Sequence, residues 1–162
     1  MAGAGEDGKF LLCRIGSRIG ALPLKDVREI MRPLPIEPLT GTPPFLLGLA
    51  IMRGSPAPVI DAGRLLGSIG SRPGSIGSRA PARFVSLRLG ERTAALAVDA
   101  VLDVRSLAAG TVADIPPLLR GAGADLVSAI GALDTELLLV LEAARLVPES
   151  IWDAIRPSGA FA

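Results

Sequence analysis

Apolar residues along the chain gather in short runs, and most of these runs are separated by tight turns. The turns are predicted at three dipeptides, Gly16-Ser17, Gly90-Glu91 and Asp134-Thr135, and at the tetrapeptide Arg53-Gly54-Ser55-Pro56. Runs of this length with turn residues between them predict strands of small barrels or sandwiches. The predicted strands are Phe10–Ile15, Gly20–Leu24, Phe45–Met52, Ala57–Ile60, Phe84–Leu89, Thr93–Val98, Leu126–Leu133 and Glu136–Leu141.

Some segments have a less regular pattern. Lys25–Ile30 alternates imperfectly and predicts either a short helical turn or a bent strand. The prolines of Pro33–Pro38 suppress helix and favour an extended path. Glu142–Val147 and Ser150–Ile155 have the pattern of short helical pieces, with Pro148 between them.

The strongest internal signal is a duplication. Phe10–Ile30 aligns with Phe84–Val104 at an offset of 74, and seven of 21 positions are identical. A second match follows at an offset of 81, between Val59–Leu66 and Val140–Val147. Because the two matches occur in the same order in both halves, we expect two halves with similar folds.

Between the halves, one heptad of Gly, Ser, Ile and Arg is written almost twice, as Gly67–Pro73 and Gly74–Ala80. Gly/Ser-rich stretches are flexible, so we expect residues 67–81 to form a flexible loop. The heptads contain neither a P-loop nor a dinucleotide-binding fingerprint. At the other end of the second half, we expect residues 151–162 to be a C-terminal tail.

Composition narrows the function. The 162 residues contain no His and no Tyr, and the formal net charge is +1. Without His, Ser-His-Asp and Cys-His catalysis are excluded, and the commonest transition-metal ligand is missing. Few aromatics and a near-zero net charge argue against nucleic-acid binding. We therefore expect a non-enzymatic protein with no cofactor and no metal.

Individual residues give little sign of chemistry. Cys13 lies in an apolar stretch and is expected to be a buried structural thiol. Trp152 is expected to anchor packing. We interpret the scattered carboxylates as strand-end and turn residues; they are Asp61, Asp99, Asp103 and Asp134. No signal peptide and no apolar run long enough to insert into a membrane is evident, so a cytoplasmic location is expected.

Several segments, in this order, resemble the CheW-type chemotaxis coupling proteins. They are Ala21–Ile30, Pro43–Gly54, Pro58–Asp61, Val98–Val104 and Ile130–Asp134. The resemblance implies a mainly β fold of two SH3-like five-stranded barrels, with short helices that include a C-terminal one. It implies a CheW-like domain over residues 8–150, with subdomains of roughly 24–83 and 10–23 plus 84–150.

The resemblance also implies a role. CheW-type proteins are adaptors that link the cytoplasmic tips of chemoreceptors to the regulatory domain of a CheA-type histidine kinase. By this resemblance the chain would be recruited to receptor arrays at the membrane without inserting into it. The chain departs from the family pattern at Ile51, where Asn is usual, and at Ala62-Gly63, where Leu-Arg is usual. These departures can change the choice of partner.

The family pattern marks candidate residues for protein binding, namely Val27, Glu29, Gly48, Arg53, Val101 and Val104. Glu29 and Arg53 form either an ion pair that shapes a binding surface or a solvated surface pair. The valines are either contacts along a receptor-binding groove or ordinary core residues. Gly48 either admits a partner or meets a backbone requirement.

Two alternatives remain open from the sequence. One is an adaptor for a related, non-flagellar chemosensory pathway, such as pilus-driven motility. The other, from a different class of protein, is a β-barrel that binds nucleic acid.

Overall fold

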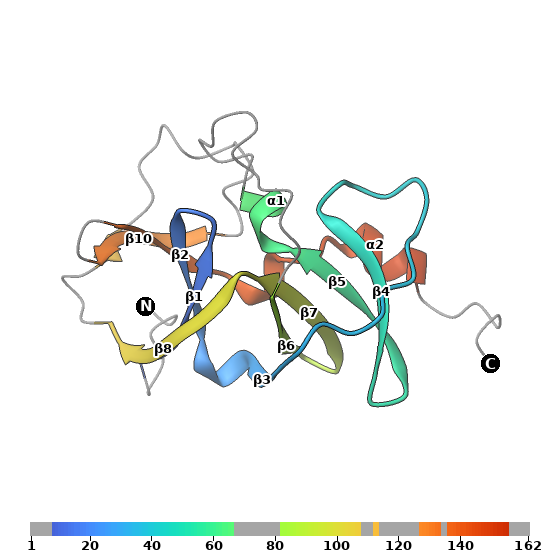
Figure 1. Ribbon diagram of the computed structural model, residues 1–162, viewed down its shortest axis with the longest axis horizontal. Coiled ribbons are helices and arrows are strands. Elements are labelled where there is room, and N and C mark those ends of the chain that lie inside the picture. The colour runs from blue at the N-terminus through green and yellow to red at the C-terminus, as the bar shows by residue number, and fades with distance from the viewer. Residues whose placement is uncertain (1–7, 67–81, 108–111, 114–126, 134–135, 156–162) are drawn as a thin grey trace.

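The computed structural model describes residues 8–66, 82–107, 112–113, 127–133 and 136–155, which build two sheets (Figure 1). The first sheet has the strand order β8-β1-β2-β11-β10-β9, and the second has the order β3-β6-β7-β5-β4. The first contains β1 (Lys9–Ile15), β2 (Arg18–Pro23), β8 (Ala100–Ser106), β9 (Val112–Ala113), β10 (Val127–Leu133) and β11 (Glu136–Leu141). The second contains β3 (Val27–Met31), β4 (Leu46–Met52), β5 (Ser55–Asp61), β6 (Arg83–Leu89) and β7 (Arg92–Val98).

The mainly β architecture with two SH3-like halves is confirmed, with two differences in detail. The first sheet has six strands rather than five, because the short β9 pairs with β10. Both strand orders are open, because no ladder among the described residues joins the two edge strands of either sheet. The halves are therefore sheets with free edges rather than fully hydrogen-bonded barrels.

The chain crosses from one sheet to the other twice. After the β1–β2 hairpin, β3 leaves the first sheet and pairs antiparallel with β6. After the β6–β7 hairpin, β8 leaves the second sheet and pairs antiparallel with β1. The second sheet therefore includes residues 83–98, and the boundary expected near residue 83 has to be moved to the β7–β8 junction. The expected subdomains placed 84–98 with 10–23, whereas the hydrogen bonds join these residues to β3 and β5.

The duplication is visible in the irregularities of the ladders. One extra residue interrupts β3 opposite β6, and one interrupts β8 opposite β1; these are Arg28 and Leu102, 74 positions apart. Leu47 in β4 and Ser128 in β10 are the extra residues of two further bulges, 81 positions apart. Both offsets equal those of the sequence repeat, so the two copies have the same strand geometry.

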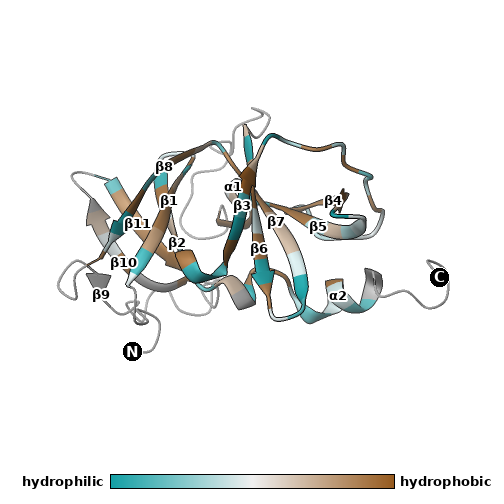
Figure 2. Cartoon of the chain, turned by 90° about the horizontal axis from the view of Figure 1, so that it is seen from below, coloured by the Kyte–Doolittle hydropathy of each residue, from teal (hydrophilic) through white to brown (hydrophobic). Residues whose placement is uncertain are grey.

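The hydrophobic side chains form one shared core and two smaller ones. The shared core lies between the sheets and contains Leu22 of the first sheet and Leu96 of the second. Phe84 centres the smaller core of the second sheet, and its counterpart Phe10 belongs to that of the first. Figure 2 shows hydrophobic residues along β1, β2 and β5. Burial of one continuous core ties the two halves together.

Short helical segments complete the fold. They are the 3-10 turns η2 (Leu24–Asp26) and η5 (Ala143–Arg145), and the helices α1 (Ala62–Leu66) and α2 (Glu149–Ile155). The two expectations for 25–30 both hold in part, because η2 is a helical turn and β3 is a strand bent by a bulge. The expected start of the C-terminal tail, residue 151, lies inside α2. Ile151 is buried in the shared core, so this part of the chain belongs to the folded domain.

Equivalent arginines hold the two helices. Arg18, the first residue of β2, donates a 3.1 Å hydrogen bond to the carbonyl of Leu66 at the end of α1. Its repeat counterpart Arg92, the first residue of β7, pairs with Glu149 at the start of α2. Helix α1 follows β5 of the second sheet, and α2 follows β11 of the first. Each arginine therefore contacts the helix that follows a strand of the opposite sheet.

The expected flexible loop at 67–81 lies outside the described residues. Within the ranges that the structure describes, no helix combines the length and hydrophobicity that crossing a membrane requires.

Candidate functional site

A surface hollow of about 470 Å³ lies beside the second sheet, and we call it the ion-pair hollow. It is bounded by β3, by the β4–β5 and β6–β7 hairpins, and by one side chain of α2. Residues that line it include Arg28, Glu29, Met52, Arg53, Pro56 and Trp152. Charged groups and apolar surface therefore meet in one concave region.

The structure brings Glu29 and Arg53 together at this hollow. Arg53 Nη2 lies 3.0 Å from Glu29 Oε2, and the two side chains are 63% and 40% exposed. An ion pair so exposed contributes about 0–1 kcal/mol to stability. The pair therefore matters less for holding the fold than for the charge pattern that it presents to solvent.

The backbone at Arg53 has an unusual conformation. The two-residue turn between β4 and β5 has positive φ angles at both positions, +51° for Arg53 and +82° for Gly54. Such hairpin turns need positive φ, which costs a non-glycine residue about 1 kcal/mol or more. Gly and Asn meet this need more easily than Arg. Arg53 is the one non-glycine residue with positive φ among the residues that the structure describes.

Gly48 has a structural reason to be glycine. Its φ is +145°, and a Cβ atom there would lie 2.2 Å from the backbone oxygen of Glu37. Glu37 runs along the outer edge of β4, where it exchanges hydrogen bonds of 2.7 and 2.9 Å with Leu49. The close approach of this segment accounts for Gly48, which is buried in β4.

The three candidate valines differ in exposure. Val27 on β3 and Val101 on β8 are repeat counterparts, and both pack partly against the shared core. Val104 is 43% exposed on β8, which is an edge strand of the first sheet. The candidate residues thus do not form one cluster: Glu29 and Arg53 line the ion-pair hollow, and Val104 stands on an open strand.

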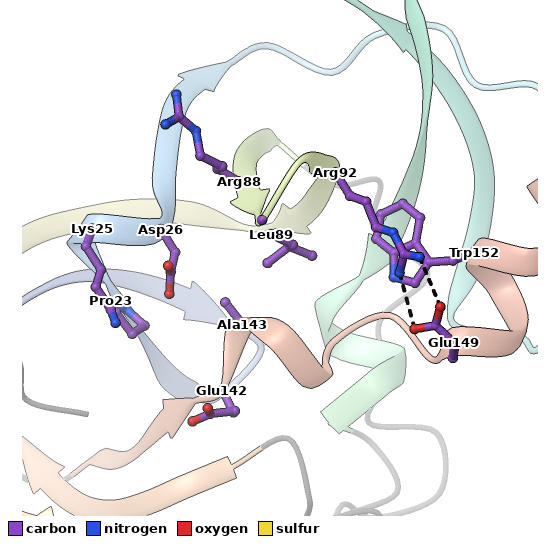
Figure 3. A pocket seen from close by; sticks show the side chains of 11 residues that line it. Pro23, Lys25, Asp26, Arg88, Leu89, Arg92, Glu142, Ala143, Glu149 and Trp152 are labelled. Carbon is purple, nitrogen blue, oxygen red and sulfur yellow. Dashed lines mark hydrogen bonds and ion pairs between the residues drawn. The ribbon is translucent and has the colours of Figure 1, made fainter. Parts of the chain in front are cut away.

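A second hollow, of about 410 Å³, lies where the two sheets meet (Figure 3). It is lined by the η2 region, the β6–β7 hairpin, η5 and α2. Burial and the neighbouring Glu142 raise the pKa of Asp26 at its edge, against the opposing effect of Lys25. Arg92 and Trp152 line both hollows, so these two side chains form the wall between them.

Sequence reasoning missed Arg28 and Arg92, and it assigned Trp152 to packing alone. A signal for Arg92 was present, because Arg18 and Arg92 are identical positions of the repeat. Nothing in the sequence placed Arg92 next to Trp152, since that contact joins β7 to a helix about 60 residues later in the chain.

The buried thiol is not a reactive group. Burial raises the pKa of Cys13 to about 12, so the side chain stays a neutral thiol near pH 7. Asp61 and Asp99 act at turns as expected: Asp61 accepts the backbone N–H of Arg64, and Asp99 accepts that of Gly16. Among the described residues, no group of three His, Cys, Asp or Glu side chains could hold a metal ion.

These features define the class first: a duplicated, two-sheet β protein of the SH3-like type with an exposed ion pair beside an apolar surface hollow. The model of the CheW-like domain matches residues 9–150. The chain therefore belongs to the CheW family, whose members are scaffold proteins of chemotaxis and related signalling pathways. The expectation from the sequence is confirmed at this level.

Two curated relatives and one solved structure agree with this assignment. The chemotaxis protein CheW of Klebsiella aerogenes is 24% identical over 147 residues, covering 91% of this chain and 86% of the relative. The protein FrzA of Myxococcus xanthus is 35% identical over 121 residues, covering 74% of this chain and 71% of FrzA. The crystal structure of the scaffolding protein TtCheW from Thermoanaerobacter tengcongensis matches with a TM-score of 0.64 and 24% identity, covering 82% of this chain and 87% of that one.

Proposed function

We propose that the chain is an adaptor that couples chemoreceptors to a CheA-type histidine kinase. One surface binds the regulatory domain of the kinase, and another binds the cytoplasmic tip of a receptor. Holding both on one small protein raises the effective concentration of each for the other. The adaptor acts in the cytoplasm, where it joins the receptor arrays at the membrane.

The observation that carries the proposal is the Glu29–Arg53 pair. It joins β3 to the β4–β5 hairpin at the rim of the ion-pair hollow, and its arginine occupies a backbone position that disfavours arginine. A charge kept at a cost in stability and exposed to solvent is available for a partner. We assign this surface to the kinase.

The receptor surface in this proposal includes Val27, Val101 and Val104. Val104 and its neighbour on the bulge, Leu102, are each 43% exposed on the edge strand β8. Exposed apolar side chains on an open strand favour contact with an apolar stripe of a receptor helix. Gly48 contributes indirectly, because it lets the Glu37 segment cover the edge of β4.

Charge reversal tests the kinase surface. Arg53→Glu should weaken assembly with kinase and receptor, measured by sedimentation of the complexes, while circular dichroism shows an intact fold. Arg53→Asn suits the positive φ and separates loss of charge from backbone effects. Adding Glu29→Arg to Arg53→Glu should recover part of the loss. The matched control is Arg83→Glu, since the exposed Arg83 lines neither hollow.

The receptor surface has its own matched pair. Val104→Lys should reduce binding to a receptor-tip fragment, whereas Leu137→Lys, at a residue that is 42% exposed on β11, should not. Normal assembly by folded Arg53→Glu would remove Arg53 from the site. Failure of the unmodified chain to bind any CheA-type kinase or receptor tip would contradict the coupling function.

A second candidate keeps the adaptor role but changes the output. The identity to FrzA, 35%, exceeds the 24% identity to the CheW of Klebsiella aerogenes. Because FrzA does not bear the name CheW, a related, non-flagellar chemosensory pathway is the second candidate for the output. Purification of the chain from its own cells, followed by identification of the kinase that accompanies it, decides between the two.

A further inference from the structure

The C-terminal helix forms one wall of the ion-pair hollow, although it is far in sequence from the family's candidate residues. Among the described side chains of α2, Trp152 is the one that lines the hollow. The side chain of Trp152 is partly buried and packs against the shared core. The hollow is therefore complete only when α2 is docked.

Two interactions hold Trp152 in this place (Figure 3). Arg92 donates hydrogen bonds of 3.2 and 3.0 Å to the two carboxylate oxygens of Glu149, one turn before Trp152. The guanidinium carbon of Arg92 lies 4.9 Å from the centroid of the indole ring. Bidentate pairing and a cation–π contact fix both the helix and the face that the ring presents.

The opposite wall and the rim provide complementary chemistry. The exposed Pro56 supplies apolar surface, whereas Met52 and Ala57, which are 7% and 1% exposed, border the hollow with little free surface. Within the described part of the chain Arg28 is in no ion pair, and its guanidinium donates only a 3.4 Å hydrogen bond to the hydroxyl of Thr93. Arg53 and Arg92, in contrast, already have carboxylate partners. A carboxylate of a partner protein would therefore give Arg28 an ion-pair partner.

We propose that this hollow receives a protruding turn of the kinase regulatory domain, which presents an apolar side chain beside a carboxylate. The apolar side chain packs between Trp152 and Pro56, and the carboxylate pairs with Arg28. Glu91, which also lines the hollow, repels the carboxylate and so directs it toward Arg28. This inference rests on the proposed function and adds α2 and Arg28 to the kinase surface.

The size of the hollow favours a folded domain over a receptor helix as the occupant. Its volume of about 470 Å³ is that of a small-molecule pocket, about 300–1,000 Å³, so it has room for a few side chains of a turn but not for the length of a helix. A long receptor helix requires an extended groove, which suits the open strand β8 better. We therefore commit to the kinase for this hollow.

Intrinsic fluorescence provides a specific test, because the chain has one Trp and no Tyr. A kinase regulatory domain in which every Trp is replaced by Phe is titrated into the adaptor. Emission of Trp152 should shift to shorter wavelength as the ring is covered, saturating at the stoichiometry of the complex. Arg28→Glu should weaken binding about tenfold or more. Arg88→Glu, an equal charge change on β6 outside this hollow, should change it less than about twofold.

The outcomes separate the two proposals. Binding of the kinase with unchanged Trp152 emission and normal affinity of Arg28→Glu would overturn this inference and leave the adaptor function standing. A shift of emission with a receptor-tip fragment but not with the kinase would show that the assigned occupant is wrong. If neither partner binds the unmodified chain, both proposals are wrong. Trp152→Phe keeps an aromatic ring in the core and should weaken kinase binding without unfolding.

Discussion

The two sheets have similar interiors but different surfaces. Phe84 and Phe10, at equivalent repeat positions, occupy equivalent small cores, and so do Val59 and Val140. The same register relation holds on both sides, because Val59 lies opposite Ala95 and Val140 lies opposite Ala21. Packing has kept the two copies alike where a change of volume would be costly.

At the surface, each sheet has an ion pair that the other lacks. In the second sheet Glu29 reaches Arg53 on another hairpin, whereas its counterpart Asp103, among the described residues, pairs with Arg105 and accepts the N–H of Val104, both on its own strand. The repeat position of Arg53 is Asp134 in the other copy, which lies outside the described residues. An acidic residue at that position cannot pair with Asp103.

The first sheet has the reverse case. Arg14 donates two hydrogen bonds to Glu136, of which the Nη2–Oε1 bond measures 3.0 Å. The counterparts in the other copy are Arg88 and Ser55, which lack the negative partner. The comparison teaches that a shared interior leaves each surface free to specialise, so the two halves can hold different partners.

The largest expected effect tests whether the halves are one folding unit. Phe84→Ala and Phe10→Ala should each cost about 3–5 kcal/mol, because both side chains are buried in small cores. Since the shared core joins the sheets, each variant should unfold in a single urea transition, followed by circular dichroism and by Trp152 fluorescence. The control Ile51→Ala, at a side chain that is 65% exposed, should cost less than about 0.5 kcal/mol. Two separate transitions would show that the sheets are independent.

The next effect tests a backbone difference between the copies. Gly48→Ala should cost about 2–4 kcal/mol, because the new Cβ would meet the oxygen of Glu37 at 2.2 Å in a positive-φ conformation. The repeat counterpart of Gly48 is Ala129, so only one copy has this requirement. As a control, Gly16→Ala, at φ +62° with open space around it, should cost about 1 kcal/mol. Equal costs for the two variants, measured by urea unfolding, would contradict the steric explanation.

A third test concerns the shared core, where Cys13 has Leu87 as its counterpart. Because burial raises the pKa of Cys13 from 9.0 to about 12, the unfolded chain loses this proton first as pH rises. The stabilising effect of the neutral thiol is complete below pH 9 and declines toward pH 12, by up to about 1.4 kcal/mol per pH unit. Urea titrations from pH 8 to 11 should show this slope, and Cys13→Ala should reduce it. Rapid alkylation of the native protein by iodoacetamide at pH 8 would contradict the burial.

The smallest effect concerns the ion pair of the first sheet. The hydrogen bonds from Arg14 lower the pKa of Glu136, so the pair stabilises the fold above the carboxyl group's unfolded pKa. This contribution is lost as the pH falls through the lowered folded value. The small difference in urea midpoint between the unmodified chain and Glu136→Gln should therefore vanish at acid pH. Glu91→Gln, at a residue without an ion pair in the described part of the chain, is the control and should show a smaller pH-dependent difference.

Much of the fold was predictable because the pattern is local. Turn dipeptides such as Gly16-Ser17 and Gly90-Glu91 lie where hairpins form, and the repeat predicted two similar halves. The sheet that β6 and β7 join was not predicted correctly, because strand partners depend on contacts between distant segments. Similarity along the chain identifies equivalent strands, but it does not show which sheet each one joins.

The candidate site was predicted in part. The family pattern paired Glu29 with Arg53, and the structure places them 3.0 Å apart. Their role in partner binding stays a prediction. Of the two interpretations of Gly48, the structure supports a backbone requirement, because the segment around Glu37 approaches it closely. No local sequence pattern could indicate that approach. Arg28 was overlooked because its place on the hollow depends on the bulge in β3.

The crossing of β3 and β8 has a consequence for the ancestry of the chain. Strands β3, β4 and β5 of the first copy complete a sheet with β6 and β7 of the second, and β8 to β11 of the second complete a sheet with β1 and β2 of the first. A polypeptide with a single copy could satisfy these edges by exchanging strands with an identical molecule across a two-fold axis. The present chain has the arrangement of such a domain-swapped homodimer fused end to end. With both copies in one chain, a mutation can change one half alone, whereas in an identical pair it changes both subunits.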